Sequence, residues 1–239
     1  MTDPTAQLVA PSAPDETLTN RFVNPLDVFN YVSPAAWIND GIEKATGIDI
    51  FGHFTDAIAG EWDAVWKFGE ALGNLANCFQ ELGINIQHGM LELDETWDGN
   101  AADAAYQYFS TFAGAVSGQQ IDLTQIQENY RQAALGAWQL SNQLGNIMQA
   151  IADKFLISAI SFAAGSATAY TGVGAVAGYG VAALQVAHML RLFNDASLKI
   201  NTAGTVILSL LGGRMTLGYQ GGSLSAMPLP ATPYTTPGA

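Results

Sequence analysis

The histidines are the side chains in this sequence best suited to metal binding or to proton transfer near neutral pH. They are His53, His88 and His188, and they are scattered along the chain. Asp56 follows His53 at a spacing of three, but a metal site normally requires three or four ligands. Cys78 is the only cysteine, so an intramolecular disulfide or a thiolate cluster cannot form. We therefore expect no metal and no other cofactor, and we expect Cys78 to be a small core residue.

Two other segments contain residue types that catalysis uses. A short acidic stretch holds Glu92, Asp94, Glu95, Asp98 and Asp103. Catalytic carboxylates need a pocket, and this stretch coincides with the expected tip of a helical hairpin, so we expect it to be solvated. The segment GVGAVAG (172–178) is glycine-rich, but it follows no predicted strand and no lysine follows its glycines, unlike a phosphate-binding loop. These patterns do not predict an enzyme.

The composition limits the classes of partner. The 239 residues carry a formal net charge of -13, which argues against nucleic-acid binding because phosphate contacts need clustered Lys and Arg. Hydrophobic residues make up 49% and charged residues 12%, so much apolar surface must be buried in a core, a partner or a membrane. The first twenty residues have neither the basic nor the apolar region of a cleavable secretory signal. We therefore expect a cytoplasmic protein, or one exported by a machine that reads other features.

Residues 55–96 show the strongest periodicity in the chain. Apolar residues recur every seven positions at Ile58, Val65, Leu72, Phe79, Ile86 and Leu93. A second row contains smaller residues in its middle, at Trp62, Gly69, Ala76, Gly83, Met90 and Trp97, and a third row holds Phe68, Leu75 and Leu82. This pattern predicts one long amphipathic helix with its interface on these rows. Glycine inside a helix costs about 1 kcal/mol, so Gly69 and Gly83 indicate a second helix packed closely along the small-residue row.

A turn and a second helix follow this pattern. Trp97, Asp98 and Gly99 form the predicted turn, in which Gly99 adopts a positive φ that ends the first helix and Trp97 packs over the hairpin end. Asn100 is a good N-cap and Asp103 suits the first turn of the next helix. The segment SGQQIDLTQIQENY (117–130) is a candidate for a bend or an interruption. The pattern predicts an all-α fold built on a long antiparallel helical hairpin.

Trp97-Asp98-Gly99 between two long helices, followed by NAADAAYQYF, resembles the WXG family of type VII (ESX) secretion substrates. The segments SGQQIDL, GAWQLSNQLGNIMQAI, TAYTGVGAVAGYGVAALQVAHMLRLFNDA and PYTTPGA extend the likeness to the N-terminal region of actinobacterial WXG-type polymorphic toxins. The resemblance implies a four-helix dimer or pseudo-dimer, exported without a signal peptide. Many members or their partners carry a Tyr-x-x-x-Asp/Glu export signal, and no tyrosine here has an acidic residue four positions later. Either a partner supplies the signal, or another cue directs export, or the chain is not exported.

The predicted organisation has five parts. They are a flexible segment (1–25), short helices (26–54), the WXG-type hairpin (55–154), an apolar Gly/Ala-rich helical region (155–213) and a disordered Pro/Gly/Thr-rich tail (214–239). Residues 155–190 contain no Asp, Glu, Lys or Arg, and Gly174 and Gly178 form a G-x-x-x-G pair. We favour a small-residue hairpin turning near Thr171–Gly174 and buried against the WXG hairpin. The alternative is a hairpin that inserts into a membrane.

The function we expect is helix–helix recognition rather than catalysis. The chain would be a substrate of type VII secretion, or the carrier or partner of a secreted toxin, and it would pair with a WXG-type partner or with itself. It would be cytoplasmic before export and secreted or at the cell surface afterwards. The alternative is a membrane-active, pore- or channel-forming protein that inserts residues 155–213.

Overall fold

A computed structural model of the chain describes residues 1–14, 22, 40–44, 47–49, 52–54 and 60–212. Every regular element in these ranges is helical, which agrees with the predicted all-α class. The elements are η1 (Pro4–Gln7), α5 (Trp62–Asp94), α6 (Asn100–Ala167), η3 (Ala169–Thr171) and α7 (Val173–Gly212). Short helical turns also occur at 40–44 and 52–54. The predicted tail, 214–239, and Ile58 lie outside the described residues.

The chain divides into two compact units, and α6 contributes to both. Unit 1 contains Met1–Ala13, Ala64–Gln132 and the chain from Leu210 onward, whereas unit 2 contains Pro14–Asp63 and Ala133–Ser209. We predicted a boundary at 154/155, but that position lies inside α6, and the units divide this helix between 132 and 133. The reason is tertiary: α7 returns along the second part of α6, so residues 133–154 join its packing partners instead of those of α5.

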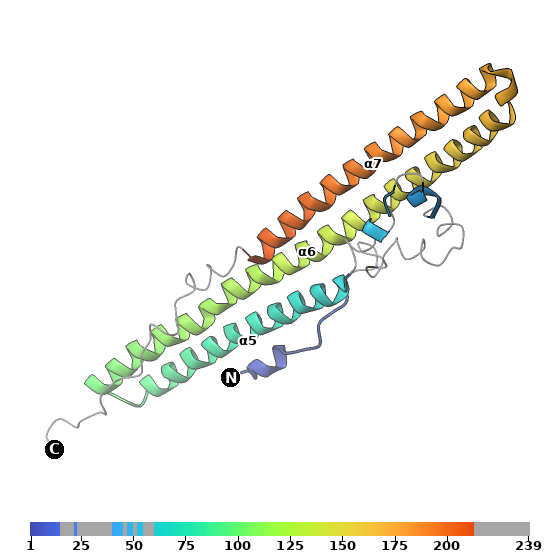
Figure 1. The fold of residues 1–239 in the computed structure, drawn as a ribbon. Coiled ribbons are helices and arrows are strands. Elements are labelled where there is room, and N and C mark those ends of the chain that lie inside the picture. Colours follow the sequence, from blue (N-terminus) through green and yellow to red (C-terminus); the bar gives the residue numbers. More distant parts are fainter. Residues whose placement is uncertain (15–21, 23–39, 45–46, 50–51, 55–59, 213–239) are drawn as a thin grey trace. The chain divides into compact units, whose positions relative to one another are not determined.

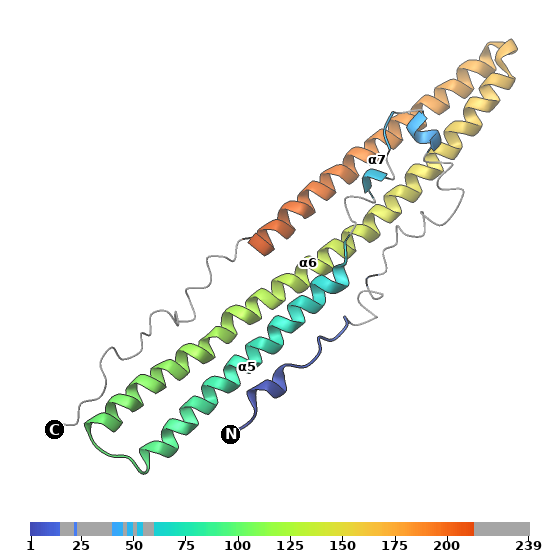
Figure 2. The ribbon, with the colours of Figure 1, turned by 60° about the horizontal axis from the view of Figure 1, so that its bottom comes forward.

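Unit 1 is built on α5 and the first part of α6, which lie side by side in both views (Figures 1 and 2). The first helix begins at Trp62 and not at Thr55, because Gly60 and Glu61 are not helical. No interruption occurs at 117–130, since α6 is helical throughout from Asn100 to Ala167. Packing against α5 favours the helix here over the local preference of Gly118 and its polar neighbours for a break.

Unit 2 pairs the second part of α6 with α7 around η3, where Gly172 adopts a φ of 67°. Its core combines α6 and α7 with the two short helical turns near residues 42 and 54. The main buried cluster comprises Ile42, Phe54, Leu144, Met148, Ile151, Met189 and Ala196. The predicted turn lay near Thr171–Gly174, and the observed one is slightly earlier, at 168–172. The pair is also longer than the expected 155–190 hairpin, because both helices continue past that segment.

Candidate interaction surface

The small-residue row of α5 forms its contact with α6. Gly69, Ala76, Gly83 and Met90 are buried, as are Trp66 and Gly73. A β-carbon on Gly69 would lie 3.1 Å from the backbone oxygen of Gln127, and one on Gly83 would lie 2.7 Å from that of Ala113. The close approach of a second backbone, predicted from Gly69 and Gly83, is therefore present. Because the earlier glycine meets the later part of α6, the two helices run antiparallel.

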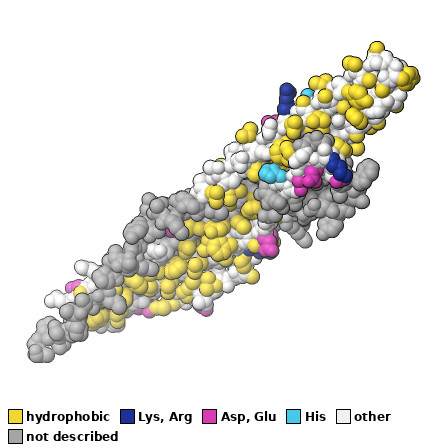
Figure 3. Space-filling view, in the orientation of Figure 1, with side chains coloured by type: hydrophobic (Ala, Val, Ile, Leu, Met, Phe, Trp, Pro, Cys, Tyr) yellow, Lys and Arg dark blue, Asp and Glu magenta, His cyan; other side chains and the backbone are white. Residues whose placement is uncertain are grey.

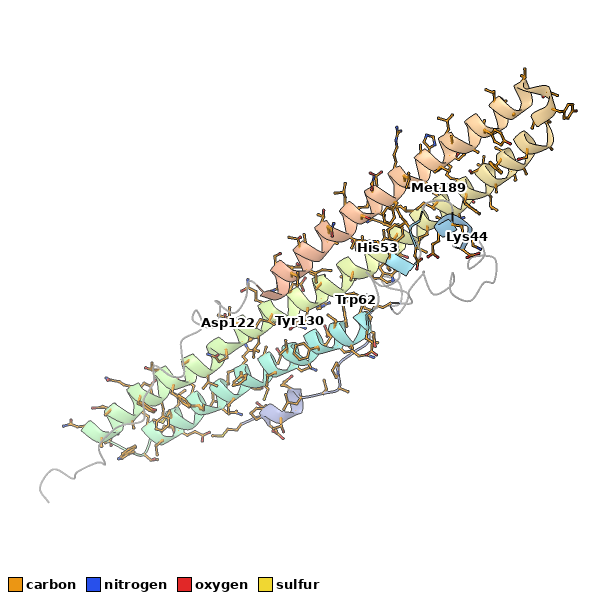
Figure 4. The ribbon with its side chains drawn as sticks, in the orientation of Figure 1. Lys44, His53, Trp62, Asp122, Tyr130 and Met189 are labelled. Atoms are coloured by element: carbon orange, nitrogen blue, oxygen red, sulfur yellow. The ribbon has the colours of Figure 1, made fainter. Side chains whose placement is uncertain are left out.

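Polar and aromatic contacts reinforce this pairing near the start of α5. The guanidinium of Arg131 lies over the Trp66 ring, 4.6 Å from its centroid, and its Nε is 3.4 Å from a Glu70 carboxylate oxygen. Gln127 donates to the same oxygen at 3.4 Å. Tyr130, labelled in Figure 4, packs edge-on against Phe68 with ring centroids 4.9 Å apart. The ring contacts and the ion pair together fix the register of this end of α5 along α6.

The large apolar residues of α5 form a neighbouring row that the contact with α6 leaves partly uncovered. We call this the large-residue row, and it comprises Val65, Phe68, Leu72, Leu75, Phe79, Leu82, Ile86 and Leu93. Phe68 is 50% exposed, Leu82 40% and Leu93 41%, while the others are half-buried. We predicted that Val65, Leu72, Phe79, Ile86 and Leu93 form the helix–helix interface. Within unit 1 the small-residue row makes the closest approach to α6, because only small side chains let the two backbones come so near, and the large-residue row lies beside it.

The predicted turn connects α5 to α6. Gly99 has a φ of 104°, in the region predicted for it, but it directly precedes α6 and does not end α5, which stops at Asp94. The backbone N–H of Trp97 donates to the carbonyl of Leu93 at 3.0 Å, and the N–H of Asp103 donates to that of Gly99 at 3.0 Å. The Trp97 side chain is 40% exposed, so it covers the hairpin end only in part. The acidic residues of this tip are exposed.

The N-terminal segment, which we predicted to be flexible, has a defined path along α5 in residues 1–13. The side-chain amides of Asn85 and Asn74 donate to the carbonyls of Thr2 at 2.6 Å and Val9 at 2.9 Å. The Thr2 hydroxyl donates to Glu81 at 2.7 Å, and that of Ser12 donates to Glu70 at 3.3 Å. We call residues 1–13 the strap. A sequence signal was present, since Asp3 followed by Pro4 is a capping pattern and Asp3 does cap η1.

The remaining sequence candidates are dispersed. His53 packs against Phe193 with ring centroids 5.6 Å apart, whereas His88 and His188 are exposed, and Asp56 lies outside the described residues. Cys78 is a free thiol and is half-buried rather than in the core. No group of three or more His, Cys, Asp or Glu residues that could hold a metal occurs in the described part of the chain.

The predicted glycine pair and Trp62 both belong to unit 2. A β-carbon on Gly178 would lie 2.7 Å from the carbonyl oxygen of Ser161 and close to Gly165, so Gly178 marks the close crossing of α6 and α7. Gly174 instead packs within the turn, against Thr168 and Thr171. Trp62, at the start of α5 (Figure 4), lines a cavity of about 200 Å³ together with residues of α6 and α7. Trp62 therefore packs within unit 2.

The chain matches no protein-family model, no curated protein and no solved structure in the comparisons. Its function has to be inferred from its own residues and geometry.

Proposed function

We propose that this chain is a non-enzymatic recognition protein whose unit 1 is a WXG-type helical hairpin that pairs with a second hairpin of the same class. The single observation that carries the proposal is the partly uncovered large-residue row on α5, beside a small-residue row already used against α6. The row repeats at the heptad spacing that packs one helix against another. A second hairpin laid along it completes a four-helix bundle.

The turn supports a secretion role for this hairpin. Trp97, Asp98 and Gly99 lie between the two helices, and the Trp97 side chain is accessible at 40% exposure. An exposed tryptophan at a hairpin end is suited to docking, because a large aromatic contributes much of the binding energy of an interface. We propose that the pair is a type VII secretion substrate, or the carrier or partner of a secreted toxin. This chain has no Tyr-x-x-x-Asp/Glu export signal, so its partner supplies that signal or another cue directs export.

The pairing can be tested with two matched substitutions on α5. Leu82 in the large-residue row is 40% exposed, and Ile84, which points to another side of the helix, is 41% exposed. Leu82→Asp should abolish association of the intact chain in sedimentation equilibrium, since it places an unpaired charge in the interface, whereas Ile84→Asp should associate like the parent. If the parent is monomeric alone, the same comparison is made with a co-expressed WXG-type partner. Equal association of both variants would contradict the proposal.

The export role needs a separate experiment. Fractionation of cultures with and without the type VII export ATPase should place the chain outside the cells only when the ATPase is present. A chain that stays in the cells in both cultures would exclude the substrate role while leaving the pairing result intact.

A further inference from the structure

We call residues 155–190 the apolar tip. It comprises the last part of α6, η3 and the first part of α7, and it contains no Asp, Glu, Lys or Arg. We propose that the apolar tip inserts into a lipid bilayer as a helical hairpin whose two arms enter from the same side. The sequence alone favoured burial of this segment against protein. The exposure of its side chains reverses that preference and points to lipid as the occupant.

The hydrophobic helices of this pair are not buried as the core helices of a water-soluble protein are. The most apolar 18-residue windows have mean hydropathies of 1.4 in α6 and 1.5 in α7, and only 11% of each window is buried. Ile160 is 69% exposed and Phe162 is 58% exposed, although two residues along a helix point to opposite sides. Val176 on α7 is 76% exposed. A protein partner would cover one face of such a helix, whereas a bilayer surrounds it.

The arms of the tip are nearly long enough to cross the hydrocarbon layer. At 1.5 Å per residue, α7 rises about 27 Å from Val173 to Leu190. The arm from Phe155 to Ala167 rises about 20 Å. A hydrocarbon core is about 30 Å thick, and about 27 Å in thinner membranes. The α7 arm is therefore long enough to bring the turn at 168–172 close to the opposite headgroups.

The threonine hydroxyls of the turn form hydrogen bonds within the hairpin, which favours insertion. The Thr168 hydroxyl donates to Ala164 O at 2.8 Å, and the Thr171 hydroxyl donates to Thr168 O at 2.7 Å. The Thr171 hydroxyl oxygen also accepts from the Gly174 N–H at 3.1 Å, which caps α7. Between the arms, Ser158 donates to Ala182 O at 3.3 Å. Hydroxyls and backbone groups that bond to one another can enter hydrocarbon at little cost.

The border of the tip suits the membrane surface. Lys154 on α6 and Arg191 on α7 are the first charged residues on each arm, and the acids Asp153 and Asp195 lie farther from the turn. Long basic side chains can reach the headgroups of anionic lipids from this depth. Figure 3 shows hydrophobic side chains over this end of the α6–α7 pair. An apolar groove of about 460 Å³ between the arms, lined by Phe155, Phe162 and Val186 among others, can take an acyl chain.

Two exposed leucines of α7 provide a matched test. Leu184, near the middle of the arm, is 61% exposed, and Leu198, beyond Arg191, is 65% exposed. The intact chain is mixed with vesicles of phosphatidylcholine and phosphatidylglycerol, and bound protein is measured by flotation. Leu184→Asp should lower the partition coefficient on the order of a hundredfold, because a carboxylate at the bilayer centre is costly, whereas Leu198→Asp should leave it unchanged. Both sites are exposed, so unchanged circular dichroism should show that both variants fold.

A second measurement reports depth directly. In a Cys78→Ser background, an environment-sensitive dye is attached to Val176→Cys or, as the control, to Leu198→Cys. Quenching by brominated acyl chains at position 176 and not at 198 is the expected result. Absence of flotation by the parent, equal flotation of both Asp variants, or quenching at neither position overturns the proposal. Lipid-free sedimentation in which Leu184→Asp alone dissociates an oligomer also overturns it and makes a second copy the occupant.

Discussion

Gly83 of α5 lies against the backbone carbonyl of Ala113 in α6, so that a β-carbon on this glycine would stand 2.7 Å from the carbonyl oxygen. Side-chain β-carbons essentially never approach another atom that closely, and neither backbone can yield without separating the helices. This contact therefore explains why α5 tolerates a glycine in its interior, and it makes the pairing of α5 with α6 sensitive to a single methyl group.

Gly83→Ala should destabilise the protein by up to about 2 kcal/mol, because overpacking costs about 1–3 kcal/mol and alanine regains roughly 1 kcal/mol in a helix. Gly114→Ala is the control, since no atom lies within 4 Å of a β-carbon there, and it should be stabilising. Urea unfolding followed by circular dichroism measures both. If Gly83→Ala proved as stable as Gly114→Ala, that result would contradict the close approach of α5 and α6 at Gly83.

The crossing of α6 and α7 should respond in the same way. A β-carbon on Gly178 would lie 2.7 Å from the Ser161 carbonyl oxygen, whereas Gly180 has open space around it. Gly178→Ala should loosen the pair and raise the rate of amide hydrogen exchange around 158–182. Gly180→Ala should leave that rate unchanged or lower it. Similar exchange in the two variants would argue against a close crossing at Gly178.

Trp97→Ala should cost less than the roughly 3 kcal/mol at the lower end of values for a buried tryptophan, because this side chain is 40% exposed. Trp66, on α5 and only 6% exposed, provides the comparison, and Trp66→Ala should cost about 3–5 kcal/mol. Thermal and urea unfolding give both values. A folded Trp97→Ala chain that still associates and is exported would remove the docking role proposed for this residue.

The strap should detach when its amide donors are removed. Asn74→Ala combined with Asn85→Ala deletes the hydrogen bonds to Val9 and Thr2, each worth about 0.5–1.5 kcal/mol. Hydrogen exchange in residues 1–13 should rise, with Asn77→Ala, at an exposed position of the same helix, as the control. Unchanged exchange in the double variant would show that these bonds do not hold the strap.

Acid should also loosen the first turn of the strap. Hydrogen bonds from the hydroxyl and then from the backbone N–H of Thr5 lower the pKa of Asp3 below its ordinary value of 3.8. A depressed carboxyl pKa stabilises the folded turn above pH 3.8, and this contribution disappears as the pH falls through the folded-state pKa. NMR titration of the Asp3 carboxyl should give a midpoint below that of an unstructured peptide of the same sequence. A midpoint equal to that of the peptide would contradict the capping bond.

Several features could be predicted because neighbouring residues encode them. The long helix α5, which ends at Asp94, follows from a heptad pattern. The positive φ of Gly99 follows from the preference of glycine for turns. Gly69 and Gly83 indicated the close approach of a second helix, since a helix keeps interior glycines where another backbone must fit. The all-α class follows from the same local patterns.

Tertiary packing decided the rest. Two adjacent rows of α5 are both apolar, and the glycines indicated close packing along the small-residue row. How far the large-residue row stays uncovered depends on the folded chain, in which Phe68 is 50% exposed. The polar segment 117–130 remains helical because α5 packs along it, although its residues suit a break. The strap depends on bonds from Asn74 and Asn85, which are distant in sequence from Val9 and Thr2. The exposure of Ile160, Val176 and Leu184 depends on which surfaces the folded chain covers, and hydrophobicity alone does not reveal that.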